Sequence, residues 1–248
     1  MNSPDPAATS NAGASQVVLI TGAAGGLGQG LVSAFAVAGW QVAAGCRQHP
    51  FESSQPNVWP LRMDVTDAEQ VNAVVQSVEQ RWGKIDLLIH NAGIAEDDLV
   101  ARMTDESWQR VLNVNLRGAF LCARAVLPGM VARQDGQILH IASFSGRVGR
   151  AGASNYCASK AGLLGLTTSL AREHGRDNIR VNALLPGFLR TKLIGTLSEA
   201  DLAANAASNS LNRLNSIEEV ARFAAFLATM RNVSGQIFQL DSRIAPWS

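Results

Sequence analysis

The sequence predicts a doubly wound α/β fold, in which a parallel sheet of about seven strands carries helices on both faces of a single domain. Short apolar segments alternate with longer segments of helical spacing along the chain. Some short segments, such as residues 85–89, are apolar almost throughout, which is typical of strands buried on both sides. The length of 248 residues suits one domain of this class.

The expected strands are short and rich in β-branched and aliphatic residues. They cover residues 17–21, 41–45, 58–65, 85–90, 137–142, 179–184 and 236–240. The expected helices place apolar residues three and four positions apart. They cover residues 26–38, 67–82, 105–133, 155–174 and 216–230. Pro128 and Gly129 lie inside the longest of these helices and predict a distortion there.

Two stretches fall outside this pattern. Residues 1–15 are mostly Ser, Ala, Asn, Pro and Gly, which predicts a flexible tail before a domain of residues 16–248. The stretch from Leu193 to Asn215 is rich in Ala, Ser and Asn and lies between an expected strand and a helix. It is a candidate for a mobile lid over a site.

Charge and composition exclude several classes of partner. A net charge of +1 gives no long-range attraction, so we expect neither nucleic acid nor a membrane as a partner. The longest apolar runs are too short to span a bilayer, and the first basic residue is Arg47, so no secretory signal is expected. Cys46, Cys122 and Cys157 are scattered, which favours reduced thiols in a cytoplasmic protein and predicts no metal site.

A glycine-rich segment follows the first strand and opens the first helix: Thr21-Gly22-Ala23-Ala24-Gly25-Gly26-Leu27-Gly28. Glycines let the backbone approach a pyrophosphate, and the helix N-terminus offers free N–H groups to the anion. The spacing G-x-x-x-G-x-G differs from the usual G-x-G-x-x-G fingerprint. The alternative is a tight turn without a ligand, but the position after the first strand favours a Rossmann-type nucleotide site.

The end of the second strand bears on cofactor choice. NAD enzymes place an acidic residue near here for the ribose 2′-OH, whereas this chain has Cys46 and Arg47. A guanidinium binds a 2′-phosphate that a carboxylate would repel, so Arg47 favours NADP(H). The alternative is a solvated surface arginine.

The ends of the third and fourth strands carry further candidates for the adenosine. Asp64-Val65 and Asn91-Ala92-Gly93 lie where strand ends form the binding crevice of an open α/β sheet. Each of these residue types also favours turns, so taken singly they are as consistent with turn residues.

Tyr156 and Lys160 are four residues apart on one expected helix and share a face, and Tyr156 is the only tyrosine. A phenol with a pKa of about 10 is a weak acid-base catalyst near neutrality, and a nearby ammonium lowers that pKa. The pair therefore fits a proton donor and its helper. The alternative is a buried aromatic beside a solvated lysine.

Three polar residues join this pair. Ser143 follows the fifth strand and is suited to bind a substrate carbonyl, with Ser145 as a competitor. Asn115 lies in an apolar helix segment, where a buried amide needs hydrogen-bond partners. It serves either a structural backbone bond or a water relay towards Lys160.

In their order, these motifs resemble those of the short-chain dehydrogenase/reductase family over about residues 16–242. Ser143 stands thirteen residues before Tyr156, as in the family, which favours it over Ser145. The resemblance implies that Tyr156 donates the proton, Lys160 lowers its pKa and binds the nicotinamide ribose, Ser143 orients the carbonyl and Asn115 anchors a relay water. It implies cofactor contacts from Gly22, Ala24, Gly25, Gly26, Leu27, Gly28, Arg47, Asp64, Val65, Asn91, Ala92, Gly93, Val114, Tyr156, Lys160, Pro186, Gly187, Leu189 and Thr191.

Within the family, residues 182–191 and 216–220 are most like 3-oxoacyl-(acyl-carrier-protein) reductases of fatty acid biosynthesis. That likeness implies a homotetramer, with Arg133 and Arg176 either near the carrier-protein contact or ordinary surface arginines. Two positions depart from the family pattern. His90 replaces the usual Asn, and Asp241-Ser242-Arg243 replaces the usual Asp-Gly-Gly.

The leading hypothesis is NADPH-dependent reduction of a 3-oxoacyl thioester to the 3-hydroxyacyl form. Another small ketone or secondary alcohol is the alternative substrate. A non-catalytic nucleotide-sensing protein on the same fold is a third hypothesis, which the intact set of Asn115, Ser143, Tyr156 and Lys160 disfavours.

Overall fold

A computed structural model describes residues 15–48, 53–191 and 198–244. Seven parallel strands form one sheet, as the sequence predicts, and their order in it is β3-β2-β1-β4-β5-β6-β7. They are β1 (Val17–Thr21), β2 (Gln41–Cys46), β3 (Val58–Arg62), β4 (Leu87–His90), β5 (Gly136–Ile141), β6 (Ile179–Leu185) and β7 (Ile237–Gln239). The direction of strand order reverses between β1 and β4, which in such sheets opens a ligand crevice at the carboxyl ends of these strands.

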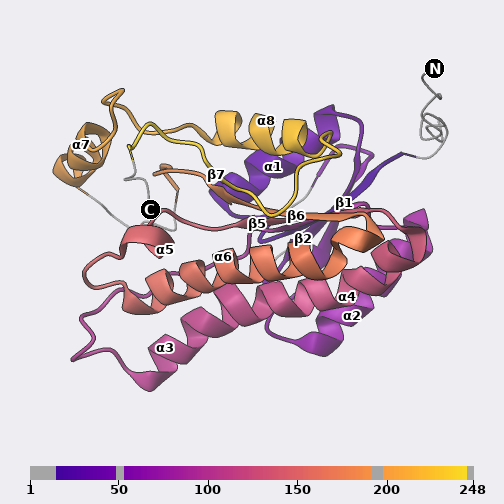
Figure 1. The fold of residues 1–248 in the computed structure, drawn as a ribbon, viewed down its shortest axis with the longest axis horizontal. Helices are drawn as coiled ribbons and strands as arrows, with labels where there is room; N and C mark the ends of the chain where they lie inside the picture. The colour runs from indigo at the N-terminus through magenta and orange to yellow at the C-terminus, as the bar shows by residue number, and fades with distance from the viewer. Residues whose placement is uncertain (1–14, 49–52, 192–197, 245–248) are drawn as a thin grey trace, which may run out of the picture.

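Helices cover both faces of the sheet (Figure 1). They are α1 (Gly26–Val37), α2 (Ala68–Trp82), α3 (Asp105–Leu112), α4 (Gly118–Arg133), α5 (Ser145–Val148), α6 (Ser154–His174), α7 (Glu199–Ala207) and α8 (Ile217–Leu227). Helices α1 and α8 lie on one face, and α2, α4 and α6 lie on the other. The sequence did not predict α5 or α7, because both are short and their residues lack an apolar stripe.

Alternate residues of the strands feed two separate cores. Val18 and Ile20 of β1 pack with Phe35 on the α1–α8 side, whereas Val17 and Leu19 pack on the α2–α4–α6 side. All four side chains are at most 1% exposed. A strand enclosed in this way has no polar face, which explains why residues 17–20 are all apolar.

The helical stretch from residue 105 to residue 133 departs from α-helical bonding at a different place from the one that the sequence predicts. Asn113–Arg117 forms a π-helical turn between α3 and α4, while Pro128 stays inside α4. A π-helical turn accommodates an extra residue and is frequent at functional sites. Here it contains Asn115, whose buried side chain bonds to residues outside the helix.

The same stretch is the one helix among the described residues with the length and apolar composition of a membrane span, and half of its most apolar window is buried. Helix α4 contacts α2, α6 and β5. Its apolar residues therefore serve the core on that face of the sheet.

Candidate active site

The glycine turn after β1 is shaped for close backbone approach. Gly22 has a φ of +65°, and a Cβ there would lie 2.8 Å from the Cα of Ala92. A Cβ at Gly28 would lie 2.2 Å from the carbonyl oxygen of Gly22. Both positions therefore require glycine. The N-cap of α1 is Gly25, so no capping side chain bonds the first N–H groups of the helix, which suits an anion site.

Asn91 fastens this turn to the end of β4. Its Nδ2 donates to the carbonyl oxygens of Thr21 and Gly22 at 3.2 and 3.0 Å. The Thr21 hydroxyl in turn accepts from the backbone N–H groups of Asn91 and Ala92, both at 3.1 Å. The amide of Asn91 thus holds the glycine turn itself, which is the turn role that the sequence left open.

A cavity of about 280 Å³ lies beside the ends of β2 and β3. Arg47 and Val114, two of the residues predicted to contact the cofactor, line it. Asp64 accepts from the N–H and hydroxyl of Thr66 at 2.9 and 2.7 Å, so one of its oxygens is used in a turn. The sequence missed the other lining residues, because they come together only through tertiary folding. They are Thr66, Glu106, Gln109, Arg110 and Asn113.

Asn115 is completely buried and fully bonded by the protein. Its Oδ1 accepts from the N–H of Ile94 at 2.8 Å, and its Nδ2 donates to the Ile94 carbonyl and to the Ser159 hydroxyl, both at 3.0 Å. Ser159 donates to the carbonyl of Tyr156 at 2.7 Å. The side chain thus fastens the π-helical turn to α6. Ser159, which the sequence did not single out, is the link between them.

Tyr156 and Lys160 lie on α6 at the carboxyl edge of the sheet. The Nζ of Lys160 donates to the carbonyl oxygen of Ile141 at 2.8 Å and lies 5.6 Å from the centroid of the Tyr156 ring. Gly93 is directly adjacent, since a Cβ there would lie 3.5 Å from this Nζ. The structure therefore brings the ends of β4 and β5 and the predicted pair together.

Burial controls the charge states of this pair. It raises the pKa of Tyr156 above its ordinary value, although a hydrogen bond with Ser143 and the charge of Arg150 act in the opposite direction. Burial also lowers the pKa of Lys160 to about 8. The phenol is consequently held protonated, contrary to the lowered pKa that the sequence predicts.

Ser143 is the better placed of the two candidate serines. Its hydroxyl accepts from the N–H of Ser145 at 3.2 Å and acts on Tyr156 through a side-chain hydrogen bond. Ser145 begins α5, so its backbone supports the Ser143 side chain. The choice of Ser143 over Ser145 as the group that binds the carbonyl stays a prediction.

The loop after β6 closes the other side of the crevice. Gly187 has a φ of +79°, and the carbonyl of Pro186 accepts from Asn215 at 2.8 Å. Leu189 is buried. The Cγ2 of Thr191 lies 3.0 Å from the position of a Cβ on Gly26. The loop predicted to contact the nicotinamide therefore reaches the start of α1, directly after the glycine turn. Of the candidate lid, residues 193–197 lie outside the described part, and the rest contains α7.

His90 belongs to a pair that the sequence did not reveal. It stands opposite His140 in the β4–β5 register, and the two ring centroids are 6.5 Å apart. Their Nδ1 atoms bond to Thr21 and Thr167, while neither Nε2 has a hydrogen-bond partner among the described residues. Burial lowers the pKa of His140 to about 4 and that of His90 well below its ordinary value. Both imidazoles are therefore neutral beside Lys160.

Arg133 and Arg176 lie far from this edge. Arg133 is the last residue of α4 and precedes β5, and Arg176 lies between α6 and β6, so both are at the amino edge of the sheet. Arg133 also donates to the carbonyls of Ile85 and Gly129 at 2.7 and 2.9 Å. Neither arginine joins the candidate site within this chain.

The family model described as short chain dehydrogenase matches residues 16–202, and the chain therefore belongs to the short chain dehydrogenase family of oxidoreductases. The 3-oxoacyl-(acyl-carrier-protein) reductase FabG of Thermotoga maritima is 41% identical over 192 residues, which cover 74% of this chain and 78% of the relative. The FabG of Escherichia coli strain K12 is 34% identical over 189 residues, with 74% and 78% covered.

A solved structure described as ElxO with NADP bound is similar in fold. Its TM-score is 0.86 at 26% sequence identity, and the match covers 92% of this chain and 98% of that one. The agreement in fold therefore extends over nearly the whole chain.

Proposed function

We propose that this protein reduces a 3-oxoacyl thioester to the 3-hydroxyacyl form with NADPH. The observation that carries the proposal is the half-buried Tyr156 phenol, held protonated beside Ser143 and Lys160 at the carboxyl edge of the sheet. A proton donor at this position fits ketone reduction. The names of the FabG relatives, at 34–41% identity, support the substrate class.

The residues present fit an NADP cofactor. Gly22 and Gly28 let the turn after β1 pack tightly against Ala92 and against itself, Gly25 places no capping side chain at the N-terminus of α1, and Arg47 borders the neighbouring cavity with a charge suited to a 2′-phosphate. The NADP-bound neighbour supports the same choice. When bound, the cofactor supplies the hydride.

The chain's own residues handle the proton and the orientation. The Ser143 hydroxyl donates a hydrogen bond to the substrate carbonyl oxygen, which stabilises the negative charge that develops there. Tyr156 transfers its phenolic proton to that oxygen. Lys160, whose ammonium lies over the ring, stabilises the resulting phenolate and supplies charge to the cofactor ribose. A relay water would bind the backbone carbonyl of Asn115, because its side chain is already fully bonded.

Assembly and substrate delivery belong to the same proposal. We infer a homotetramer formed through α4 and α6, on which Phe120 leaves an apolar side chain 44% exposed. Residues 16–248 act as one domain. In the cytoplasm, an acyl carrier protein presents the substrate to this domain. Arg133 and Arg176 lie at the amino edge, so a carrier protein bound there would serve the site of another subunit.

The test is a panel of substrates followed by NADPH absorbance. We expect 3-oxoacyl thioesters to be reduced with a kcat/KM at least about tenfold above that of simple ketones, and NADPH to be preferred over NADH. Preference for an unrelated ketone or secondary alcohol would favour the alternative substrate class. Binding of NADPH without turnover of any carbonyl would contradict the proposal.

A further inference from the structure

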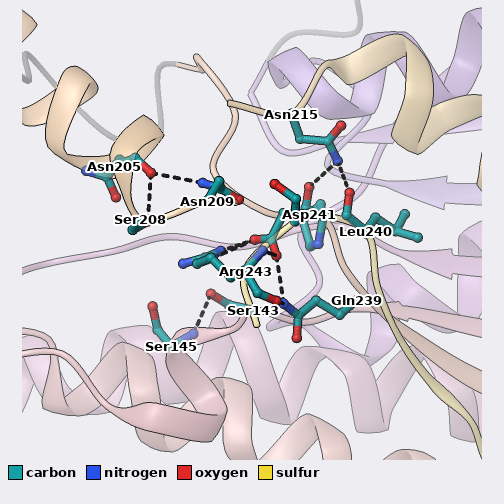
Figure 2. A network of polar contacts seen from close by, with 12 residues as sticks. Ser143, Ser145, Asn205, Ser208, Asn209, Asn215, Gln239, Leu240, Asp241 and Arg243 are labelled. Carbon is teal, nitrogen blue, oxygen red and sulfur yellow. Dashed lines mark hydrogen bonds and ion pairs between the residues drawn. The ribbon is translucent and has the colours of Figure 1, made fainter. Parts of the chain in front are cut away.

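The segment that departs from the family pattern, Asp241-Ser242-Arg243, connects three parts of the candidate site (Figure 2). Asp241 packs against Gly187, where a Cβ would lie 2.8 Å from the Asp241 Cβ. Its Oδ1 accepts from Gln239 at 2.7 Å, so this carboxylate is fixed at the end of β7. Its side chain is only 2% exposed.

Arg243 extends from this anchor to the loop that carries Ser143. Its Nε donates to Asp241 at 2.7 Å, and its Nη2 forms an ion pair with the same carboxylate. The guanidinium carbon lies 4.3 Å from the centroid of the Phe144 ring. An arginine whose charge is held by a carboxylate and whose face lies on an aromatic ring restrains both partners.

Ser242 joins the same segment to the region beyond α7. Its carbonyl accepts from the N–H and hydroxyl of Ser210 at 3.1 and 2.8 Å, and its hydroxyl accepts from the N–H of Leu211 at 3.1 Å. Asn215 donates to the carbonyls of Leu240 and Pro186 at 2.7 and 2.8 Å. One short segment thus bonds the described part of the candidate lid to the loop after β6.

We propose that Arg243 is a positioning residue for Ser143 and acts through Phe144. Asp241 fixes Arg243 relative to the loop after β6, and Ser242 fixes it relative to the chain beyond α7. The inference rests on the proposed function. Phe144 begins the turns that lead into α5: its carbonyl accepts from the N–H of Arg147 at 2.9 Å. The Arg243 guanidinium therefore holds the turn in which Ser143 is aimed at Tyr156. Glycine at position 243, as is usual in the family, would have no side chain to do this.

The variant Arg243→Gln tests this inference through two measurements on the whole protein. We expect hydrogen exchange at the amides of Gly146–Gly149 to become about tenfold faster, because their helical turn loses its restraint. We expect kcat for the thioester to fall about tenfold, while the Kd of NADPH is unchanged, because misplacing the carbonyl donor affects the reaction and not cofactor binding. Arg243→Lys retains a cation for Asp241 and Phe144. It should therefore restore most of the exchange protection and most of kcat.

Arg231→Gln is the matched control, because Arg231 is an exposed arginine paired at 3.8 Å with Asp135 at the amino edge of the sheet. It should leave both measurements unchanged. Wild-type values for either measurement in Arg243→Gln would overturn the inference. The exchange measurement does not need turnover, so it tests the role of Arg243 even if the wild-type protein does not reduce the thioester. Absence of wild-type turnover would instead count against the proposed function.

Discussion

The ammonium of Lys160 lies over the face of Tyr156, 5.6 Å from the ring centroid, and donates at 2.8 Å to the Ile141 carbonyl at the end of β5. The bond to Ile141 fixes the cation to the sheet. The side chain is 4% exposed, so little solvent compensates its charge. The ammonium is therefore held in place by its helix, α6, and by its bond to the sheet, and its burial should change how the reaction rate depends on pH.

Reduction should lose rate as the pH rises through about 8. Burial lowers the pKa of Lys160 to about 8, so the ammonium is charged below that pH and neutral above it. We expect kcat/KM to have an alkaline limb near pH 8 in the wild-type protein, because the neutral amine no longer stabilises a phenolate. A profile flat to the ordinary lysine value of 10.5 would contradict this interpretation.

Arg47→Ala should weaken NADPH binding by about tenfold or more and leave NADH binding nearly unchanged. The reason is that Arg47 lines the cavity beside β2, where its guanidinium can bind the 2′-phosphate that NADH lacks. Titrating both cofactors by fluorescence measures the two Kd values. If their ratio is the same in wild type and variant, Arg47 is only a surface arginine.

Gly22→Ala should unfold more readily than wild type and bind no cofactor, because the added Cβ would lie 2.8 Å from the Ala92 backbone. The control is Gly39→Ala, where φ is +84° but nothing lies within 4 Å. The control isolates the backbone penalty of about 1 kcal/mol. Urea unfolding of both variants should show a larger loss at Gly22; equal losses would mean that the close approach to Ala92 is easily relieved.

Arg176→Glu should raise the KM for a carrier-bound substrate about tenfold and leave a soluble thioester mimic unaffected, because a charge reversal repels an acidic carrier protein. Arg133 is left intact, since it bonds to the Ile85 carbonyl and its removal would disturb the fold. Arg231→Glu, at the same edge of the sheet, is the control. Equal effects on both substrates would remove the docking role of Arg176.

The strands and the strand-end motifs could be predicted from sequence because they depend on local pattern. Residues 17–20 are apolar because both faces of β1 are covered, and Gly22 follows the strand because the turn needs a positive φ. These constraints leave a direct trace in residue type. The phosphate turn and the position of Tyr156 and Lys160 on one helix were therefore accessible without coordinates.

Other features depend on contacts between distant residues and leave no such trace. In the π-helical turn Asn113–Arg117, the Asn115 side chain forms hydrogen bonds with Ser159 and Ile94, which are distant in sequence. The sequence indicated a distortion of this helix only near Pro128. Spacing also gave the wrong sign for the pKa of Tyr156. The spacing revealed the nearby cation, but it did not reveal the burial of Tyr156, which has the largest effect on its pKa. The contact of Arg243 with Phe144 was hidden for the same reason.

The most direct test of the account is turnover in Tyr156→Phe, because this change removes one hydroxyl and keeps the ring beneath Lys160. We predict that kcat for the thioester falls about a thousandfold or more, in the range expected for loss of a general acid, while the Kd of NADPH stays within about twofold of wild type. A variant that binds NADPH normally and still reduces the substrate at close to the wild-type rate would contradict the assignment of Tyr156 as the proton donor.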